Sequence, residues 1–334
     1  MSFSSTPNSA VPRLLSVLLL VSTAAAGAER PSLVRYEATA TVMGCTFGVA
    51  AYGPGREVLA GQVEAAFEEA RRIDAWLSNY RADSDLSRLN RSAAQSPTAV
   101  SDELFNLLAQ AAGYSGASEG AFDMTVGPLV RTWGFYEGSG RLAGDDEVDQ
   151  ALEKTGYRFV ELDPVHKTVR FTRPGVELDP GGIGKGYAVD RMVEVLRLAG
   201  VKAALVNACH SSIYGLGAPP DDPSGWMLEI ENAVGGVAET LVLKDESLST
   251  SGSQEKFFEA GGVTYSHIID PRSGRPAAGV AAISVVAPTA LDSEVWSTAI
   301  FVNGLDWSSR RAPAGLRVYA CPAGSGCRWL PPRP

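Results

Sequence analysis

Histidine is scarce in this sequence: His166, His210 and His267 are the only three among 334 residues. Basic residues do not gather at any point of the chain, and the formal net charge is −9. This balance argues against nucleic acid as a partner, because binding to a phosphate backbone needs clustered Lys and Arg. Internal repeats and low-complexity linkers are also missing, so we expect one compact unit.

Long apolar runs are missing except for one, "LLSVLLLVSTAAAG", which follows Arg13. This run is short and rich in Ser, Thr and Ala for a membrane span, and it ends at an A-x-A cleavage pattern at 26–28. We therefore predict a signal peptide at 1–28. The remainder, 29–334, is expected to be exported to the periplasm or cell envelope without stable membrane insertion. An uncleaved anchor is the alternative, whereas a lipoprotein anchor would need a cysteine after the run.

Cysteine is also rare, with four residues in the whole chain. Export would place them in an oxidising compartment, which permits disulfides. The short Pro/Gly loop of "CPAGSGC" predicts a bridge between Cys321 and Cys327. Spacing alone cannot pair Cys45 with Cys209. For these two we expect buried structural thiols, with a metal cluster that includes His210 as the alternative.

The hydrophobic pattern predicts both strands and helices. The predicted strands are 34–53 (a pair turned at Gly44), 169–179, 201–208 and 279–288. The predicted helices are 57–77, 101–115 with Ser101 as the N-cap, 187–200 and 293–304. Strands and helices mix without strict alternation, which favours the α+β class, with mixed sheets and flanking helices.

The glycine-dense stretch "DPGGIGKG" (179–186) stands where the third helix is predicted to begin. Backbone N–H groups and the helix dipole at such a start favour phosphate, and Lys185 adds a mobile cation. The spacing fits neither the P-loop nor the dinucleotide pattern GxGxxG. A purely structural tight turn is therefore an equal alternative.

Glu294 and Thr298 are one helical turn apart and therefore share one face of the last predicted helix. A carboxylate and a hydroxyl presented together are hard oxygen ligands of the kind that Mg²⁺ prefers. A solvated glutamate in the first turn of a helix is the alternative.

The stretch "YSHIIDPRSGRP" (265–276) holds His267 beside a turn that contains Asp270, Pro271 and Gly274. An imidazole fixed in this way can serve as a general base whose pKa is tuned by its neighbours. A histidine that only holds the turn by hydrogen bonding is the alternative.

A series of ordered motifs carries a resemblance to a known family. The motifs are "MGCTF" (43–47), "LSNYRADSDLSRLN" (77–90), "AFDMTVGPLVRTWGF" (121–135), "DPGGIGKGYAVD" (179–190), "LSTSGSQEKFF" (248–258) and "YSHIIDPRSGRP" (265–276). In this order they resemble those of the ApbE family, the FAD:protein FMN transferases, over nearly all of 29–334.

The resemblance implies a fold of two intimately packed lobes with a flavin cleft between them. It also implies a reaction: FMN moves from FAD to a Thr or Ser hydroxyl of a target electron-transfer protein through a phosphoester bond. Mg²⁺ is the implied cofactor, AMP is released, and the family's targets resemble D-G-x-[ST]-G-A-[ST]. An FAD pyrophosphatase that gives FMN and AMP, and a non-catalytic periplasmic FAD-binding protein, are the alternatives.

Site residues follow from the resemblance position by position. The implied FAD contacts are Met43, Tyr80, Ala121, Phe122, Asp123, Asp179, Gly181, Lys185, Tyr187, His267 and Ile268. The implied metal ligands are the backbone carbonyl of Gly184 and the side chains of Glu294 and Thr298, and the implied catalytic base is His267.

Two places depart from the family pattern. Glu294 stands where the family usually has Asp, so the carboxylate reaches one methylene further. "NACHSS" (207–212) stands where the family has N-x-G-G-D/N, so that Cys209 and His210 bring side chains where bare backbone is expected. These departures indicate a divergent branch and make His210 a second candidate imidazole.

Overall fold

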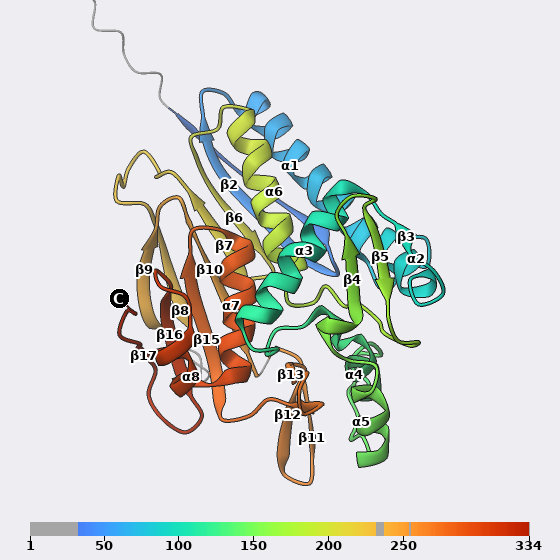
Figure 1. Ribbon diagram of the computed structural model, residues 1–334. Coiled ribbons are helices and arrows are strands. Elements are labelled where there is room, and N and C mark those ends of the chain that lie inside the picture. Colours follow the sequence, from blue (N-terminus) through green and yellow to red (C-terminus); the bar gives the residue numbers. More distant parts are fainter. Residues whose placement is uncertain (1–32, 232–236, 254, 334) are drawn as a thin grey trace, which may run out of the picture. The chain divides into compact units, whose positions relative to one another are not determined.

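An eight-stranded antiparallel sheet is the largest element of the fold (Figure 1). The computed structural model describes residues 33–231, 237–253 and 255–333, so the predicted signal peptide at 1–28 lies outside the described residues. The strands in spatial order are β1 (Val34–Val42), β2 (Cys45–Gly53), β6 (Ala203–Ala208), β7 (Ser212–Leu216), β10 (Glu246–Gly252), β15 (Val280–Ala287), β16 (Arg317–Pro322) and β17 (Arg328–Trp329).

Three helices pack side by side along this sheet: α1 (Arg56–Leu77), α6 (Gly184–Leu198) and α7 (Ala290–Asn303) (Figure 1). The apolar residues of α1 recur at helical spacing, and Leu59, Val63 and Phe67 are all buried. α7 is buried on most of its surface, because it lies between α6 and the strands β10 and β15. Within this layer the start of α6 contacts α7, and α7 contacts β10.

The remaining helices and strands lie outside this sheet and its layer of three helices. The helices are α2 (Asp85–Ser92), α3 (Asp102–Ala117), η1 (Met124–Val126), α4 (Gly127–Thr132), α5 (Asp145–Leu152), η2 (Tyr157–Phe159) and α8 (Leu305–Arg311). A three-stranded sheet contains β3 (Thr98–Ala99), β5 (Thr168–Phe171) and β4 (Val160–Asp163). The two-stranded pairs are β8 (Trp226–Glu231) with β9 (Val237–Leu243), β11 (Phe257–Ala260) with β12 (Val263–Ser266), and β13 (Ile269–Asp270) with β14 (Arg275–Pro276).

The predicted α+β class is confirmed, and most predicted elements appear close to their expected bounds. The N-cap of α3 is confirmed as well, because the Ser101 hydroxyl accepts a hydrogen bond from the N–H of Leu104 at 3.2 Å. From Leu33 to Pro334 the chain forms one compact unit.

The strand predicted at 169–179 is wrong beyond residue 171. Strand β5 ends at Phe171, and Pro174 and Gly175 follow, the latter with a φ of 82°. Proline cannot donate to a strand ladder, and a positive φ turns the chain away from extended geometry. β5 also belongs to the small sheet and β6 to the large one, so the glycine loop connects two sheets.

Both cysteine pairs form disulfides. The predicted Cys321–Cys327 bridge is confirmed, with its Cα atoms 4.1 Å apart. Cys45 and Cys209 are also joined, with a Cα–Cα distance of 5.6 Å, so the expectation of buried free thiols and the metal-cluster alternative are both wrong. The pairing of β2 with β6 brings the two together, because Phe47 lies opposite Ala208.

Within the part of the chain that the structure describes, we find no helix whose length and apolar content would let it cross a bilayer.

Candidate functional site

Several chain turns meet at one end of the large sheet. There β2 begins and β6 ends, since the N–H of Cys209 bonds the carbonyl of Thr46 at 3.0 Å. Next to them β10 approaches its end, where the N–H of Thr250 bonds the carbonyl of Ser211 at 2.8 Å. Helix α7 lies at the same end, because Ser251 of β10 contacts Thr298. The start of α6 is joined to α7 there, because the N–H of Gly186 donates to Glu294. This convergence defines the candidate site.

The glycine loop and α6 approach α7 very closely. A Cβ atom at Gly186 would lie 2.3 Å from the carbonyl oxygen of Ala290, so no other residue fits there without moving the backbone. The N–H of Gly186 donates to Glu294 Oε2 at 2.5 Å. The predicted glycine loop and the predicted helix pair are therefore in direct contact.

Glu294 has a buried carboxylate in which only one of the two oxygens is hydrogen-bonded. Glu294 is 5% exposed, and its Oε1 atom has no hydrogen-bond partner. Burial raises the pKa of Glu294 to about 7, while the positive charge of Lys185 and the Gly186 hydrogen bond act in the opposite direction. The alternative of a solvated glutamate is excluded by this burial.

Thr298 lies one turn further along α7 and is half-buried. Its Oγ1 atom is 3.3 Å from the Ser251 hydroxyl, and a Cβ placed on Gly182 would come within 3.5 Å of it. The same imagined Cβ would lie 3.3 Å from the ring of Phe122. Gly182 therefore gives the loop room to lie between an aromatic ring and a hydroxyl.

Most N–H groups of the glycine loop already have partners. Gly181 donates to Asp179 Oδ1 at 2.6 Å, and Ile183 and Gly184 both donate to the carbonyl of Pro180. The sequence suggested that free N–H groups of this loop would bind phosphate, but in the described residues few of them are free to do so. The helix dipole of the 15-residue α6 and the half-buried Lys185 remain as positive groups.

Asp179 fixes the start of the loop through side chains that the sequence interpretation missed. Besides Gly181, its carboxylate accepts from the hydroxyl of Tyr136 at 2.5 Å and from the amide of Asn79 at 3.4 Å. The ring of Tyr80, which is 74% exposed, packs edge-on against Tyr136. The only available signal for Tyr136 was its position directly after the motif at 121–135.

Both carboxylate oxygens of Asp123 accept hydrogen bonds from within the protein. Its Oδ1 accepts from the N–H and the hydroxyl of Thr125 at 2.8 and 2.7 Å, and its Oδ2 accepts from the N–H of Tyr157 at 2.6 Å. The flanking Ala121 and Phe122 are buried as well. Of this predicted trio only the Phe122 ring is seen next to the glycine loop.

His267 is held by one backbone carbonyl. Its N–H and its ring Nδ1 both lie 3.0 Å from the carbonyl oxygen of Lys256. Burial lowers the pKa of His267 to about 4, although the Lys256 hydrogen bond acts in the opposite direction. The neighbouring Ile268 is buried, and the ring of Phe135 meets the imidazole edge-on.

Two other predicted contacts lie on different sides of the site. The Tyr187 hydroxyl donates to Glu103 at 2.7 Å, and its ring stacks on that of Trp76. Met43 is half-buried in the β1–β2 turn, has a φ of 50° and donates its N–H to Asp74 at 3.1 Å.

The turn that departs from the family pattern has an unusual backbone. Cys209 and His210 have φ values of 57° and 58°, a region that favours glycine. The Cys45 disulfide and the side chain of Asn207, whose Oδ1 accepts from the N–H of His210 at 2.9 Å, stabilise this conformation. The His210 side chain is exposed.

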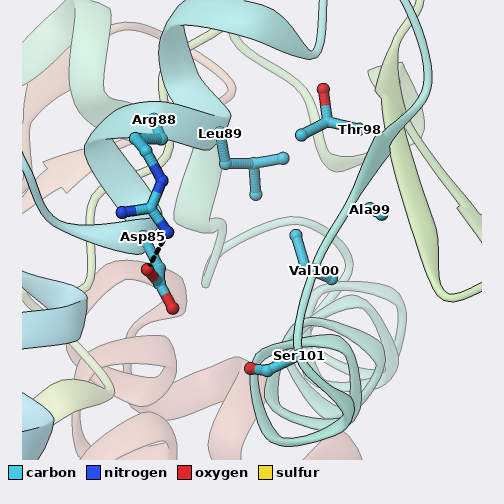
Figure 2. Close-up of a pocket in the computed structure, with 7 residues that line it drawn as sticks. All are labelled: Asp85, Arg88, Leu89, Thr98, Ala99, Val100 and Ser101. Carbon is cyan, nitrogen blue, oxygen red and sulfur yellow. Dashed lines mark hydrogen bonds and ion pairs between the residues drawn. The ribbon is translucent and has the colours of Figure 1, made fainter.

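A separate surface pocket lies between α2 and the strand β3 (Figure 2). An ion pair between Asp85 and Arg88 forms one wall, and residues 98–101 form the opposite one. None of the sequence-predicted site residues lines it. The candidate site therefore remains the one at the end of the large sheet.

The fold and the site together define an α+β protein in which a glycine loop meets a buried carboxylate and a hydroxyl at the end of an antiparallel sheet. The model of the ApbE family matches residues 43–318, and the chain belongs to the ApbE family. The resemblance stated from the motifs is thereby confirmed.

Two relatives are similar in sequence to this chain over most of their lengths. The FAD:protein FMN transferase of Klebsiella pneumoniae is 32% identical over 277 residues, which cover 81% of this chain and 83% of the relative. The FAD:protein FMN transferase of Treponema pallidum is 34% identical over 269 residues, 75% of this chain and 74% of the relative.

Solved structures show the same architecture. The ApbE protein of Thermotoga maritima superposes with a TM-score of 0.80 at 28% identity, covering 88% of this chain and 96% of that one. The flavinyl transferase ApbE of Pseudomonas stutzeri gives a TM-score of 0.77 at 32% identity, covering 89% and 94%.

Proposed function

We propose that this protein is an FAD:protein FMN transferase. It moves FMN from FAD to a Thr or Ser hydroxyl of a target protein through a phosphoester bond and releases AMP. One observation carries the proposal: Glu294 is buried beside the glycine loop with Oε1 unpaired. An unpaired buried carboxylate oxygen costs stability, so its presence in this protein, whose relatives are transferases, supports a bound ligand at this place.

The residues present fit a divalent cation. Within the described residues no three carboxylate, imidazole or thiolate groups gather, so a cation here would depend on few charged ligands. Mg²⁺ is bound in this way, with one or two carboxylates and neutral oxygens beside substrate phosphates. We assign Glu294, Thr298 and the carbonyl of Gly184 as its ligands. When bound, the ion would offset the negative charge that develops on the pyrophosphate.

Lys185 and the start of α6 bind the phosphate oxygens in this proposal. Lys185 lies close enough to Glu294 to oppose the rise of that carboxyl's pKa. A positive charge and a helix N-terminus aimed at transferring phosphate stabilise the transition state. Because most loop N–H groups have internal partners, these two groups carry more of the task than the loop amides do.

His267 is assigned as the general base that takes the proton of the target hydroxyl. When Nδ1 donates its proton to the Lys256 carbonyl, the lone pair of the other ring nitrogen, Nε2, is free to accept a proton. Because the pKa of His267 is lowered, this imidazole is neutral at pH 7 and its Nε2 is unprotonated. The attacked phosphorus is the one on the FMN side, and the oxygen bridging to AMP takes the electron pair as that bond breaks.

The flavin itself is assigned to the residues that the resemblance implies, some beside the glycine loop and others further from it. Phe122 offers a ring beside Gly182, and Tyr80 offers an exposed ring on Tyr136. Met43, Ala121, Asp123, Asp179, Gly181, Tyr187 and Ile268 complete the proposed set. In this set Asp123 and Asp179 act by fixing backbone, because their carboxylates are already hydrogen-bonded inside the protein.

Export is part of the proposal. A signal peptide at 1–28 would send the chain to the periplasm or cell envelope, and the two disulfides are of the kind that persist in an oxidising compartment. The target would be an exported or membrane-bound electron-transfer protein with a D-G-x-[ST]-G-A-[ST] segment.

Mass spectrometry tests the proposal directly. Protein 29–334 is incubated with FAD, Mg²⁺ and a peptide that contains the target segment, alongside a peptide with Ala at the acceptor position. Flavinylation of the first peptide only, with release of AMP, is the expected result. Free FMN and AMP with both peptides unmodified would indicate a pyrophosphatase, and intact bound FAD would indicate a carrier.

A further inference from the structure

A row of buried hydroxyl groups lies between β10 and α7. Ser247, Ser249 and Ser251 alternate along β10 and therefore face the same side, toward α7. The hydroxyls of Ser247 and Ser249 lie 3.0 and 2.7 Å from that of Ser293, and the hydroxyl of Ser251 lies 2.8 Å from that of Ser297. All five residues are buried, so each hydroxyl needs a partner.

The three hydroxyls nearest the glycine loop can be assigned donor and acceptor roles by counting protons. Ser297 Oγ donates to the backbone carbonyl of Glu294 at 2.9 Å. Since a hydroxyl has a single proton, Ser297 must accept from Ser251 at their 2.8 Å contact. Ser251 has then used its own proton, so at the 3.3 Å contact it must accept the proton of Thr298. No other assignment makes all three hydrogen bonds together.

We infer that Ser251 is a positioning residue for the metal ligand Thr298. It takes the Thr298 proton and so leaves both lone pairs of Oγ1 free, in a hydroxyl that also lies next to Gly182 of the loop. A hydroxyl coordinates a cation through a lone pair, so this orientation prepares the ligand before any ion arrives. The inference rests on the proposed function in one respect, the assignment of Thr298 as a ligand.

The same strand offers a matched control. Ser249 is two residues away on the same face of β10, is also buried and also bonds a serine of α7, but none of its described hydrogen bonds involves Thr298. Loss of its hydroxyl removes packing and hydrogen bonding between β10 and α7 without changing the Thr298 proton. Any effect that is merely structural should therefore appear in both variants.

Binding of Mn²⁺ alone, measured by titration calorimetry on the metal-free protein, tests the inference. Ser251→Ala is expected to weaken Mn²⁺ binding about fivefold to tenfold, the worth of one hydrogen bond, whereas Ser249→Ala should stay within about twofold of the parent. In Thr298→Ala protein, which no longer has a proton to place, Ser251→Ala should have no further effect. In the transfer assay the Mg²⁺ concentration for half-maximal activity should rise by the same factor, with kcat at saturating Mg²⁺ and KM for FAD unchanged.

The possible failures are distinguishable. Equal Mn²⁺ affinity of Ser251→Ala and parent, or equal weakening by Ser249→Ala, would overturn the positioning role and leave the proposed function intact. A parent that binds no Mn²⁺ would overturn the metal assignment and with it this inference. If Ser251→Ala does not fold, Ser251→Cys replaces it, because a thiol still fills the position of the hydroxyl but is a weak acceptor, and the same loss of affinity is expected.

Discussion

Asp123 and Glu294 are both buried carboxylates, yet the protein treats them in opposite ways. The carboxylate of Asp123 accepts three hydrogen bonds, two of them from backbone N–H groups. The carboxylate of Glu294 accepts one, from Gly186, and its Oε1 has none. Burial raises the pKa of both groups, but only around Asp123 do several hydrogen bonds oppose that rise.

The difference separates a structural carboxylate from a ligand-binding one. Asp123 joins the segment before α4 to the N–H of Tyr157, so its cost of burial is offset within the protein. Glu294 has no such compensation, and a cation at Oε1 would supply it. The resemblance assigns Asp123 to FAD and Glu294 to the metal of the same site, and the two residues are therefore expected to fail in different ways when they are changed.

The largest effect is expected for Asp123→Ala. Removing the carboxylate leaves two backbone N–H groups and a hydroxyl without their partner in a buried region, and each costs about 1–3 kcal/mol. We expect a loss of about 4 kcal/mol in the free energy of unfolding, measured by urea denaturation. A stable variant that instead lost FAD binding would show that Asp123 faces the flavin and that the comparison is wrong.

The second effect concerns pH in metal-free protein. Glu294 has a folded-state pKa of about 7 and an unfolded-state pKa near the ordinary value of 4.5. Between these values the folded state binds more protons, so stability falls as pH rises from about 4.5 to 7. Between pH 4.5 and pH 8 we expect the parent to lose about 3 kcal/mol in its free energy of unfolding through Glu294. Glu294→Gln should not show this loss.

Urea denaturation of both proteins in EDTA, at pH 4.5 and pH 8, measures this difference. Addition of Mg²⁺ at pH 8 should raise the stability of the parent and leave Glu294→Gln unchanged, since ligand binding stabilises only a protein that has the site. Parallel pH profiles for the two proteins would mean that Glu294 is as well paired as Asp123.

The third effect is expected at His267, which resembles Glu294 in having only part of its side chain bonded. His267→Ala should lower flavin transfer about a hundredfold, the usual worth of a general base, while FAD still binds. The comparison variant is His210→Ala, since the exposed His210 is the other candidate imidazole and should leave turnover unchanged. A reversed result, with His210 essential, would move the base to the Cys209–His210 turn.

The sequence predicts local features better than long-range ones, and the site shows why. The helical face of α1 and the Ser101 cap depend on residues within one or two turns, so their patterns are visible in the chain. The pairing of Cys45 with Cys209 spans 164 residues and depends on the register between β2 and β6. Likewise the motif around Asp123 does not reveal that its partner is the N–H of Tyr157, 34 residues further on.

The contact between the glycine loop and α7 could be predicted only in part from the sequence. Helical spacing alone placed Glu294 and Thr298 on one face. It could not show that Gly186 lets α6 touch α7, which is what buries Glu294. Nor could it show that Ser251 lies beside Thr298, because strand and helix meet only through the tertiary fold.

The smallest effect is expected for Glu294→Asp, which restores the residue usual in the family. The shorter carboxylate keeps its charge and the helix face it shares with Thr298, but it draws back from the Gly186 N–H by one methylene. A cation can compensate for that distance through a water, because Mg²⁺ commonly retains several waters in protein sites. We therefore expect transfer within about fivefold of the parent and a modestly raised Mg²⁺ requirement, against a loss of about a hundredfold for Glu294→Gln. Steady-state transfer rates across a Mg²⁺ titration measure both variants. If Gln supports transfer as well as Asp does, the charge of Glu294 is not used for the metal, and its unpaired oxygen needs another explanation.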